Sequence, residues 1–408
     1  MIIKNKCSIC NGKVDQIVDL GLSPPANNFV KNADQIYESY PLIVDYCKKC
    51  FCIQLRHCLS KNELYSYYTY STPKIDSLES HYSNLLEKLN SLGYANPNQS
   101  CIEIGSNNGN LLKFLKPHFR KILGVDPAKN IAKLAIDKGI ETVIDFFSKA
   151  SAKDIIRKYK KFDVAIARHM FAHNENPAEL LSAINIILQD DGLFLIENAY
   201  ALDTFRNGEF DQIYHEHMFY FSALNISALM KKFNFELIDF SHSNVHGGSG
   251  VFICARKGRH IPTPSVEAVF KIERAAFKKN KIFDDFKFHI ESNKTKAIDL
   301  INTEITNGKI VGSYGAPAKA FTVFSYYGLN NDTIAFCIDT TPTKIGKVFP
   351  YFNIPVLSEE SLKDLEYKTI IVNAWNYKED IIKKASSIFK TGTKLVFLIP
   401  NLEIYIVK

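Results

Sequence analysis

The 408-residue sequence predicts an α/β protein made of three parts. Six of its nine cysteines lie before Ser60, which indicates a small metal-binding module at the N-terminus. Further along the chain, two separate series of apolar strand patterns alternate with helical patterns. Because strands that alternate with helices form parallel sheets, each series predicts a doubly wound, Rossmann-like domain. We therefore expect the metal module at 1–70, the first Rossmann-like domain at 71–255 and the second at 256–408.

The composition indicates a folded protein that lies free in the cytoplasm. The chain is 46% hydrophobic, and its net charge of +7 is spread without long basic blocks, so we expect no nucleic-acid partner. The first ten residues lack a signal-peptide pattern, and no apolar stretch is long enough to cross a bilayer, so we expect no membrane partner. Since three domains can bury much of one another's surface, we expect a monomer.

The N-terminal module contains two matched Cys-x-x-Cys pairs. Cys7 and Cys10 form the first pair and Cys47 and Cys50 the second, and each pair can offer two thiolates to one metal ion. Four thiolates complete the coordination of a structural zinc ion, and a segment this small otherwise lacks a core. The alternatives are isolated buried thiols or a redox pair. The remaining cysteines of the module are Cys52 and Cys58. We expect a structural zinc ion with no open position for catalysis.

The elements of the two series follow from apolar periodicity and from turn residues. A helix at 77–92 leads into strands at 101–105, 121–126, 141–145, 162–169 and 192–198, with intervening helices from Asn110, Asn130, Lys149 and Pro177. The second series has strands at 309–315, 334–339, 369–375 and 394–400, with helices from Ala316 and Lys378. The charged, helical segment 270–306 connects the two series.

A glycine-rich loop follows the first strand of the first series. In "EIGSNNGNLL", Gly105 and Gly109 have the spacing of a tight nucleotide-binding turn. Asn107 stands where dinucleotide-binding enzymes have their second glycine, and no Lys-Ser pair makes a P-loop. Glu103 precedes the loop, and Asp126 ends the next strand in "LGVDPA". The alternative is an inert turn between a strand and a helix.

This loop and the following acid resemble motifs I and II of class I S-adenosylmethionine-dependent methyltransferases. The resemblance implies that the glycines let the backbone approach the cofactor and that the acid accepts hydrogen bonds from the ribose hydroxyls. In "IDFFS", Asp145 and Phe146 lie where that family binds adenine. The implied cofactor-binding residues are Gly105, Asn107, Gly109, Asp126, Asp145 and Phe146.

The whole chain resembles the sugar-nucleotide C-methyltransferases, three-domain enzymes that methylate C3 of a 4-keto-deoxy sugar on a nucleoside diphosphate. The resemblance covers the zinc module with "LGLSPPANNF", the loop "EIGSNNGNLL", the block "IYHEHMFYFS" and the "HGGSG" at 246–250. It continues through "YGAPAKA", "IDTTPTKIGKVFP" and "NAWNY". It implies a nucleotide-sugar substrate, S-adenosylmethionine as cofactor and a structural zinc ion.

The resemblance also implies roles in "IYHEHMFYFS". His217 is expected to be the catalytic base, Glu216 to orient or tune it, and Tyr214 to help hold the sugar, with His173 a further active-site candidate. Chemistry agrees, since a histidine can remove a hydrogen next to a ketone if nearby donors stabilise the enolate, and that step needs no metal. Without the resemblance, a polar surface turn is an equal alternative.

Two stretches depart from the family pattern. Arg168 and His169 stand where small polar residues are expected, and Gly250 and Val251 follow "HGGS" where a more polar continuation is usual. We interpret both departures as signs of a different sugar or base-side partner, and His169 as a satisfied histidine beneath the cofactor.

Substrate contacts are expected from two further places. In "YSYYTYST", Tyr68 and Tyr70 form either core or a wall of the substrate site. In "SYGAPAKA", Tyr314 and Gly315 precede a helix whose N-terminus can hold phosphates, and Lys319 adds a charge. Lys344 and Lys347 could assist, although lysines are usually solvated.

Two rival functions remain open. An O- or N-methyltransferase acting on a sugar nucleotide or similar anion could use the same histidine to deprotonate a hydroxyl. A catalytically silent binding protein could keep both Rossmann-like sheets as a scaffold, but the intact Tyr214, Glu216, His217 and Asp126 argue against it.

Overall fold

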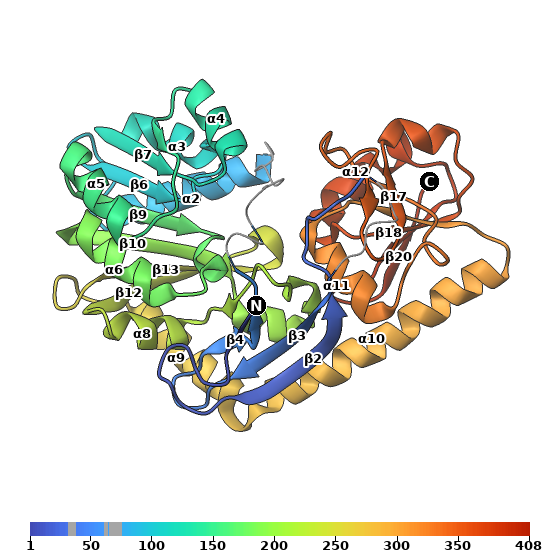
Figure 1. The fold of residues 1–408 in the computed structure, drawn as a ribbon, viewed down its shortest axis with the longest axis horizontal. Coiled ribbons are helices and arrows are strands. Elements are labelled where there is room, and N and C mark those ends of the chain that lie inside the picture. Colours follow the sequence, from blue (N-terminus) through green and yellow to red (C-terminus); the bar gives the residue numbers. More distant parts are fainter. Residues whose placement is uncertain (32–37, 61–63, 65–75) are drawn as a thin grey trace.

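The computed structural model describes residues 1–31, 38–60, 64 and 76–408. Figure 1 shows two α/β lobes side by side, a left lobe (residues 76–256) and a right lobe (residues 311–408), with a small β-module and one long helix below them. The two predicted Rossmann-like sheets and the N-terminal module are thereby confirmed. The predicted substrate-wall residues Tyr68 and Tyr70 lie outside the described residues.

The N-terminal module is an antiparallel sheet in the order β11-β4-β3-β2. Its strands are β2 (Asp15–Ser23), β3 (Tyr40–Tyr46), β4 (Ile53–Leu55) and β11 (Phe219–Tyr220), and a separate pair joins β1 (Ile2–Ile3) to β5 (His57–Cys58). Strand β11 comes from the left lobe, and its Phe219 pairs with Gln54 of β4. The residues just before β11, which include the "YHEH" stretch, are therefore fixed between the module and the left lobe.

The sheet of the left lobe has the order β12-β13-β10-β9-β6-β7-β8. Its strands are β6 (Ser100–Ile104), β7 (Lys121–Val125), β8 (Thr142–Val143), β9 (Phe162–Arg168), β10 (Leu188–Ala199), β12 (Phe235–Ser243) and β13 (Ser249–Arg256). The five strands that the sequence predicts are parallel, and β12 and β13 add an antiparallel hairpin at one edge. Periodicity did not reveal this hairpin, because its strands lack the helical crossover that marks the others.

Helices cover the left sheet where apolar residues recur at helical spacing. They are α2 (Asp76–Ser91), α3 (Asn110–Leu115), α4 (Lys129–Asp137), α5 (Lys149–Tyr159), α6 (Pro177–Ile187), α7 (Ala201–Asn207) and α8 (Ala223–Lys231). Local sequence sets their starts: Ser148 caps α5 by accepting from the Ser151 N–H, and Asn176 caps α6 ahead of Pro177. In α4 the buried side consists of Ile131, Ala132 and Ala135. The 3₁₀ turns of the chain are η1 (Lys116–His118), η2 (Phe171–His173), η3 (Phe210–Gln212), η4 (Val245–Gly247), η5 (Lys278–Asn280), η6 (Glu359–Lys363) and η7 (Trp375–Tyr377).

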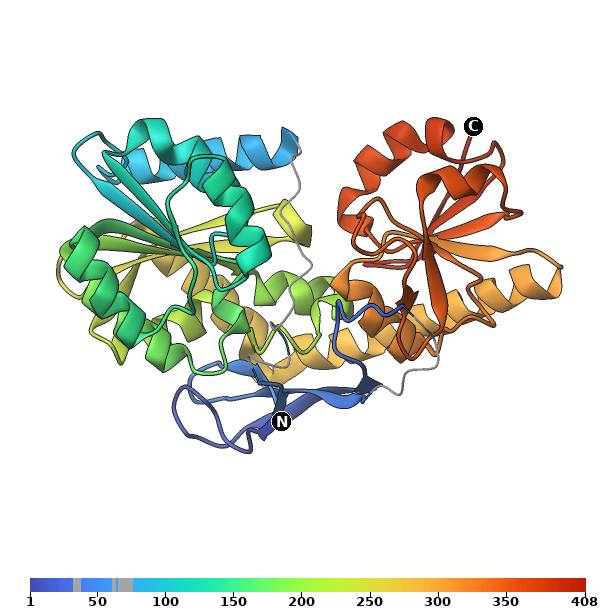
Figure 2. The same cartoon turned by 45° about the horizontal axis from the view of Figure 1, so that its top comes forward.

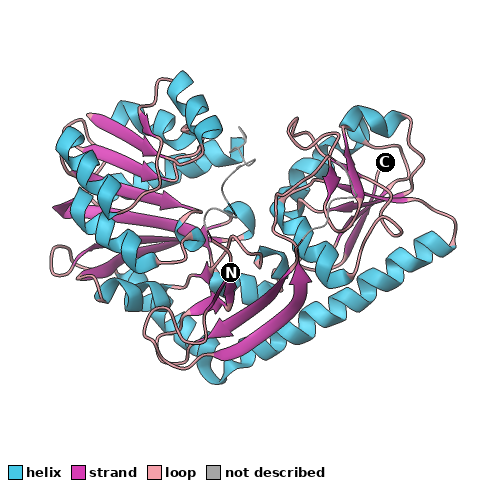
Figure 3. Ribbon diagram, viewed as in Figure 1, coloured by secondary structure: helices cyan, strands magenta, loops and turns pink. Residues whose placement is uncertain are grey.

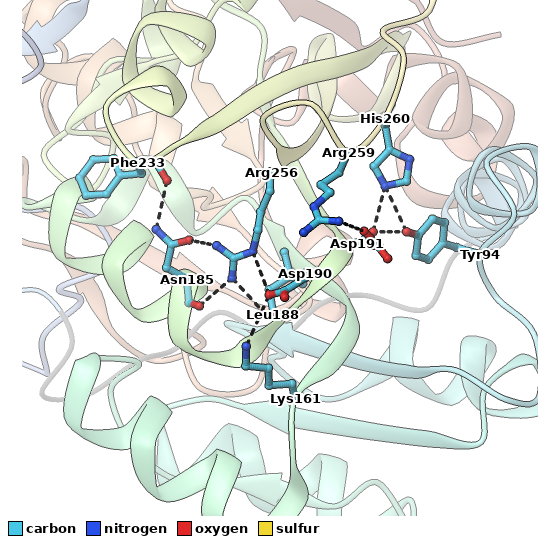
Figure 4. A network of polar contacts seen from close by, with 10 residues as sticks. All are labelled: Tyr94, Lys161, Asn185, Leu188, Asp190, Asp191, Phe233, Arg256, Arg259 and His260. Atoms are coloured by element: carbon cyan, nitrogen blue, oxygen red, sulfur yellow. Dashed lines mark hydrogen bonds and ion pairs between the residues drawn. The ribbon is translucent and has the colours of Figure 1, made fainter.

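A polar network ties the beginning of β10 to the end of β13 (Figure 4). The Arg256 guanidinium donates to the Asn185 side chain and, at 2.9 Å, to the Asn185 carbonyl, and its Nε lies 3.8 Å from Asp190. Lys161 approaches the same Asp190 carboxylate at 3.7 Å. These contacts lie at the amino end of β10, the end opposite the glycine loop. They therefore fasten the sheet and leave its carboxyl edge to the functional site.

The sheet of the right lobe has the order β16-β17-β15-β14-β18-β19-β20. Its strands are β14 (Val311–Tyr314), β15 (Cys337–Ile338), β16 (Val348–Phe349), β17 (Ile354–Leu357), β18 (Thr369–Val372), β19 (Lys394–Phe397) and β20 (Glu403–Ile406), with helices α11 (Ala318–Tyr327) and α12 (Lys378–Ile388). The chain leaves central β14 towards β15 on one side and later returns to β18 on the other. Ligands of open α/β sheets bind at such a switch point. The sequence did not predict β16, β17 and β20.

Two helices connect the lobes, as the charged segment 270–306 predicts. They are α9 (Pro264–Phe277) and α10 (Lys281–Thr306), and α10 runs beneath both lobes and beside β2 (Figure 2). With 26 residues, α10 is about 39 Å long. Its buried side consists of Phe283, Phe286, Ile290, Asn293, Ala297, Ile301 and Glu304, a spacing of three or four residues throughout. Within the parts of the chain that the structure describes, no helix has the length and apolar character needed to span a membrane.

The segment 24–30 joins the N-terminal module to the right lobe (Figure 3). The ring of Phe29 packs edge-on against Phe321 of α11, with 5.3 Å between ring centroids. Val30 and Val348 of β16 exchange two backbone hydrogen bonds, of 3.1 and 2.8 Å. The module is therefore bound to both lobes.

Candidate functional site

The two Cys-x-x-Cys pairs form turns with the same backbone geometry. In the first, the Asn11 N–H donates to the Cys7 carbonyl at 2.8 Å, and in the second the Phe51 N–H donates to the Cys47 carbonyl at 2.8 Å. Asn11 and Phe51 have φ angles of 58° and 61°, in the left-handed region that lets the chain curl back. Each turn therefore presents its two sulfurs to one point.

The four sulfurs are close enough to share one zinc ion. The ligand atoms of Cys7, Cys10, Cys47 and Cys50 all lie within 4.8 Å of one another. The Sγ atoms are 3.3 Å apart in one cross-pair and 3.5 Å apart in the other. Zinc–sulfur bonds of 2.3 Å in a tetrahedron require sulfurs about 3.8 Å apart, so the group fits zinc. Four thiolates leave no ligand position for substrate, and the zinc ion is structural.

The glycine loop of the left lobe has no room for side chains at its two glycines. Gly105 and Gly109 have φ angles of 70° and 71°. A Cβ atom on Gly105 would lie 2.8 Å from the Met170 side chain, and one on Gly109 would lie 2.9 Å from Ala135. The glycines thus serve the tight turn and the close packing of α3 and α4, and they leave the loop backbone uncovered by side chains of their own.

Asp126, the residue that follows β7, holds this loop from the side. Its carboxylate accepts the Asn107 N–H at 2.8 Å and the Ala128 N–H at 3.0 Å, and burial raises its pKa. These bonds use two of the carboxylate's roughly four lone-pair sites, so acceptor capacity remains for the ribose hydroxyls of the predicted cofactor. Asn107 contributes its backbone N–H to the loop.

The predicted adenine side lies just after β8. The Asp145 carboxylate accepts the Phe146 N–H at 2.7 Å. The Phe146 ring is 38% exposed, whereas the neighbouring Phe147 is buried. An exposed aromatic ring that follows the edge strand β8 offers a flat apolar face to a purine.

Buried charges gather at the carboxyl ends of β6, β9 and β10. The Arg168 Nε lies 3.1 Å from a Glu103 oxygen, and His81 and His169 approach the Glu197 carboxylate at 2.7 and 3.8 Å. Burial opposes ionisation of Glu197, yet hydrogen bonds from His169 and His81 hold its pKa well below its usual range. Burial raises the pKa of Glu103 to about 7. Arg168 and His169, which depart from the family pattern, therefore have charged partners within the fold.

The "YHEH" stretch forms a buried turn. The His217 N–H donates to the Tyr214 carbonyl at 2.9 Å, which closes the turn and brings the two rings together with 4.0 Å between centroids. His215 and Glu216, at the tip of the turn, are 1% and 3% exposed. The alternative of a polar surface turn is therefore wrong, because the turn is covered by the N-terminal module and by the left lobe.

The hydrogen bonds of His217 define its tautomer. Its Nδ1 lies 2.8 Å from the Gln212 carbonyl, which can only accept, so Nδ1 carries the proton. Its Nε2 lies 2.7 Å from the Tyr214 hydroxyl, which therefore donates. Burial, and then the neighbouring His173, hold the pKa of His217 well below its usual range. His217 is thus a neutral imidazole whose Nε2 lone pair accepts a hydrogen bond from the Tyr214 hydroxyl.

His173 and Glu216, the other two predicted catalytic residues, lie in different surroundings from each other. His173, at the end of η2, has its ring centroid 5.1 Å from that of His217, and burial lowers its pKa to about 3. Glu216 accepts a hydrogen bond of 3.0 Å from Asn27 of the N-terminal module, and burial raises its pKa to about 7. Glu216 thus ties the turn to segment 24–30, and its predicted tuning of His217 stays a prediction.

A chain of contacts links the turn to the glycine loop. The Met218 N–H, just after the turn, donates to the Ala172 carbonyl of η2 at 2.9 Å. Met170, two residues before Ala172, is the side chain that closes over Gly105. The turn that contains His217 is therefore linked to the predicted cofactor loop through Met170 and η2.

The right lobe contributes a buried ammonium group. The Lys319 side chain in the first turn of α11 is 13% exposed, and its Nζ lies 3.9 Å from Asp211 and 4.5 Å from the centre of the Trp375 ring. The Trp375 Nε1 donates to the same Asp211 carboxylate at 2.6 Å. Lys319 of the right lobe therefore faces Asp211 of the left lobe, at the junction of the two lobes.

The other predicted right-lobe residues lie around α11's beginning. Gly315 has a φ of 85°, and the Tyr314 hydroxyl is held by Glu359 inside the right lobe. Lys344 is 8% exposed and donates to the Ala316 carbonyl at 2.8 Å, so the interpretation of Lys344 as a solvated surface group is wrong.

Several residues that shape the site were missed by the sequence reasoning. Asn27 lies inside "LGLSPPANNF", a stretch that the resemblance covers without giving any of its residues a role. Gln212 acts through its backbone carbonyl, which leaves no side-chain signal. His81 and Asp211 are single polar residues in ordinary contexts. Glu197 gave the one usable signal, a charge inside the apolar strand "GLFLIEN".

Comparisons with known proteins agree with this architecture. Three family models match the chain in order: a zinc binding domain at residues 7–65, a methyltransferase domain at 78–239 and a C-methyltransferase C-terminal domain at 244–400.

Individual proteins were also similar. C-methyltransferase NovU of Streptomyces niveus is 29% identical over 97% of this chain and 96% of its own. The uncharacterized protein MJ1123 of Methanocaldococcus jannaschii is 27% identical over 35% of this chain and 67% of its own. Among solved structures, magnesium protoporphyrin IX methyltransferase of Synechocystis PCC 6803 with bound S-adenosylmethionine is 11% identical, with a TM-score of 0.35, over 48% of this chain and 92% of that one.

Proposed function

Because this chain is a methyltransferase of the three-domain C-methyltransferase family, we propose that it methylates C3 of a 4-keto-deoxy sugar carried on a nucleoside diphosphate. The bound S-adenosylmethionine supplies an electrophilic methyl group. One observation supports the proposal: the neutral imidazole of His217, with Nε2 as its acceptor, stands on a turn that η2 links to the loop against which Met170 packs. Such a group suits the removal of a carbon-bound proton next to a ketone.

The reaction follows from the hydrogen bonds of His217. Its Nδ1–H stays bound to the Gln212 carbonyl, which fixes the ring while Nε2 takes the C3 proton. The electron pair of the broken C–H bond forms the C3=C4 double bond while the carbonyl pair moves to the C4 oxygen, which gives an enolate. Its C3 would then bond to the methyl group as the S–CH₃ bond of S-adenosylmethionine breaks, and S-adenosylhomocysteine would leave with the electron pair of that bond. Once Nε2 is protonated, it no longer accepts from Tyr214. We expect the Tyr214 hydroxyl to turn its O–H from Nε2 to the enolate oxygen as charge develops there.

The diphosphate of the substrate is assigned to the right lobe. Lys319 supplies a buried positive charge, and the first N–H groups of α11 point out of the same end of the helix. We expect the predicted substrate contacts of Tyr314 and Gly315 at this same end of α11. The diphosphate and the reacting sugar would therefore lie on opposite sides of the Lys319–Asp211 pair.

The test combines product analysis with solvent exchange. The chain is incubated with S-adenosylmethionine and a small panel of 4-keto sugar nucleotides, and the methylated position is determined by NMR. Exchange of the C3 hydrogen for solvent deuterium is followed in parallel with S-adenosylhomocysteine in place of the methyl donor. We expect a C-methyl product and exchange for the same sugar, and methyl transfer to oxygen or nitrogen would instead support the rival O- or N-methyltransferase.

A pair of variants assigns the base. His217→Asn is expected to slow both exchange and methyl transfer by about 10²–10⁴, while binding of the cofactor and the sugar nucleotide stays nearly unchanged. His118→Asn, in η1 of the left lobe, is the matched control and should behave like the unmutated chain. A His217→Asn enzyme that exchanges deuterium at the normal rate would exclude His217 as the base.

A further inference from the structure

A short segment of the left lobe, residues 210–213, leads directly into the turn that contains His217. The Gln212 carbonyl in this segment lies 2.8 Å from Nδ1 of His217 and fixes the tautomer of the ring. A backbone carbonyl can do so only while its peptide group keeps one orientation. The contacts of the residues on either side of Gln212 therefore decide how firmly this carbonyl is held against the ring.

A threonine of the right lobe anchors the residue that follows Gln212. The Thr322 hydroxyl on α11 donates to the Ile213 carbonyl at 2.6 Å, a contact between residues 109 positions apart. Thr322 is 1% exposed and Ile213 is fully buried, so water has little access to this hydrogen bond. The peptide group on one side of Gln212 is therefore held by the right lobe.

The tryptophan of η7 anchors the residue that precedes Gln212. The Trp375 Nε1 donates to the buried Asp211 carboxylate at 2.6 Å. The left lobe leaves space for the indole, because a Cβ atom on Gly247 of η4 would lie 2.6 Å from the ring. Two motifs that the sequence resemblance covers without a role, "HGGSG" and "NAWNY", therefore meet at the junction of the lobes.

The packing of the same segment also comes from α11. The ring centroid of Phe210 lies 5.1 Å from that of Tyr326 and 5.4 Å from that of Tyr327, and Phe210 is fully buried. Residues 210, 211 and 213 thus each contact a side chain of the right lobe. The carbonyl of the remaining residue, Gln212, is the one that holds the imidazole of the left lobe.

We propose that Thr322 and Trp375 of the right lobe are positioning residues for the base His217. They hold the residues on both sides of Gln212, so that its carbonyl stays on Nδ1 and the lone pair of the ring stays on Nε2. This inference rests on the proposed function, because it assigns what orients the base of that reaction. It gives the right lobe a part in proton transfer in addition to substrate binding.

The tautomer matters because only one of the two neutral forms of His217 can take a proton at Nε2. The Tyr214 hydroxyl, 2.7 Å from Nε2, can accept as well as donate, so it is compatible with either form. The Gln212 carbonyl can only accept, so it selects the form with the proton on Nδ1. If this carbonyl turned away, the proton could move to Nε2 and leave no lone pair for the C3 hydrogen.

The first test removes the hydroxyl of Thr322. Thr322→Val should lower kcat for methyl transfer, and the rate of C3 deuterium exchange, about tenfold or more, because a buried carbonyl loses its donor and its peptide group can turn. The KM for the sugar nucleotide should stay within about twofold, since the base acts in the transition state. Thr322→Ser keeps the donor and should restore most of the rate.

Thr393→Val is the matched control for this change. Thr393 lies in the right lobe just before β19, is also 1% exposed and also donates to a backbone carbonyl, that of Lys390, at 2.6 Å. Its loss should lower the stability of the right lobe and leave kcat unchanged. An equal fall of kcat in Thr393→Val and Thr322→Val would overturn the inference, because it would show a general effect of weakening the right lobe.

The second test removes the N–H of Trp375. Trp375→Phe keeps an aromatic ring in the space beside Gly247 and should lower kcat in the same direction as Thr322→Val. Neither change should slow residual exchange further when it is combined with His217→Asn, since residues that act through one group are not additive with its loss. A further tenfold loss in those double variants would show that Thr322 and Trp375 act elsewhere.

A spectroscopic test reports the tautomer directly and needs no substrate. The full chain is labelled with ¹⁵N in its 11 histidines, and the His217 signals are identified by their absence in His217→Asn. We expect the Nδ1–H form in the unmutated chain and in Thr393→Val, and a measurable share of the Nε2–H form in Thr322→Val and Trp375→Phe. A pure Nδ1–H form in both of these variants would overturn the inference.

Failure of this inference can be told apart from failure of the proposed function. A C-methyl product, made by variants whose kcat and tautomer do not depend on Thr322 or Trp375, leaves the function intact and removes the positioning role. A tautomer that depends on these two residues, together with a methyl group found on oxygen, keeps the positioning role and removes the C-methylation.

Discussion

Replacing Glu216 by Gln should stabilise the protein at pH 8 more than at pH 5. Burial raises the pKa of Glu216 from 4.5 to about 7, and the carboxyl group is 3% exposed, so solvent screens it little. Between pH 4.5 and about pH 7, Glu216 stays protonated in the folded chain and is ionised in the unfolded chain. Stability therefore falls as the pH rises through this window and levels off above pH 7.

The magnitude follows from the two pKa values. Ionisation of the buried carboxyl costs about 1 kcal/mol at pH 5 and about 3 kcal/mol at pH 8. Gln cannot ionise, yet its amide oxygen still accepts the 3.0 Å hydrogen bond from Asn27. We therefore expect Glu216→Gln to gain about 1 kcal/mol at pH 5 and about 3 kcal/mol at pH 8.

The assay is urea unfolding of the zinc-loaded chain at both pH values, followed by circular dichroism. The matched control is Glu366→Gln, which replaces an exposed loop carboxylate and removes no buried charge. An equal gain at pH 5 and pH 8, or a loss of stability at pH 8, would refute the reasoning. Methyl transfer should meanwhile slow less in Glu216→Gln than in His217→Asn, because the imidazole remains.

Three further predictions concern the cofactor, the metal and the base. Asp126→Ala should weaken S-adenosylmethionine binding by about 1.5–3 kcal/mol in a calorimetric titration, because hydrogen bonds to a charged group are lost, and unchanged affinity would mean that the ribose lies elsewhere. Metal analysis should find about one zinc per chain, and Cys47→Ser should lose it and unfold the module; a variant that keeps its zinc would contradict the four-thiolate site. Because the pKa of His217 is held below 6.5, the acidic limb of the kcat/KM profile should lie below pH 6.5, and a limb at or above that value would argue against a neutral imidazole.

Periodicity was enough to predict the central strands and helices, because each is a local pattern. Strands β6, β7 and β9 begin and end within one residue of the expected bounds, helix α5 begins at the expected Lys149, and β10 begins four residues earlier than expected. Strands β12, β13, β16, β17 and β20 were missed, because they are parts of antiparallel pairs or short additions and carry no repeated helical crossover. The division of the chain at residues 70 and 255, and the monomeric state, stay predictions.

Less of the candidate site than of the fold could be predicted from the sequence. Tyr214 and His217 lie three residues apart, so one turn could be expected to bring them together. The hydrogen bond between Asn27 and Glu216 spans 189 residues, and no local pattern encodes it. Lys344 stayed open between an assisting role and a solvated group for a related reason: the residue type favours the surface, and only the fold shows its ammonium group bound to the Ala316 carbonyl.

The pairing of Val30 with Val348 has a consequence for how the chain matures. The backbone partners of segment 24–30 lie more than 300 residues later, so during synthesis that segment emerges long before the strand it pairs with. Domains generally fold as units from the N-terminus, and the zinc turns at Cys7 and Cys47 need only the first part of the chain. Asn27 is then held in its final place only after β16 has left the ribosome. We therefore expect the tie between Asn27 and Glu216 to form late. A chain truncated before residue 348 would carry the four cysteines of the metal site and would lack the strand that holds segment 24–30.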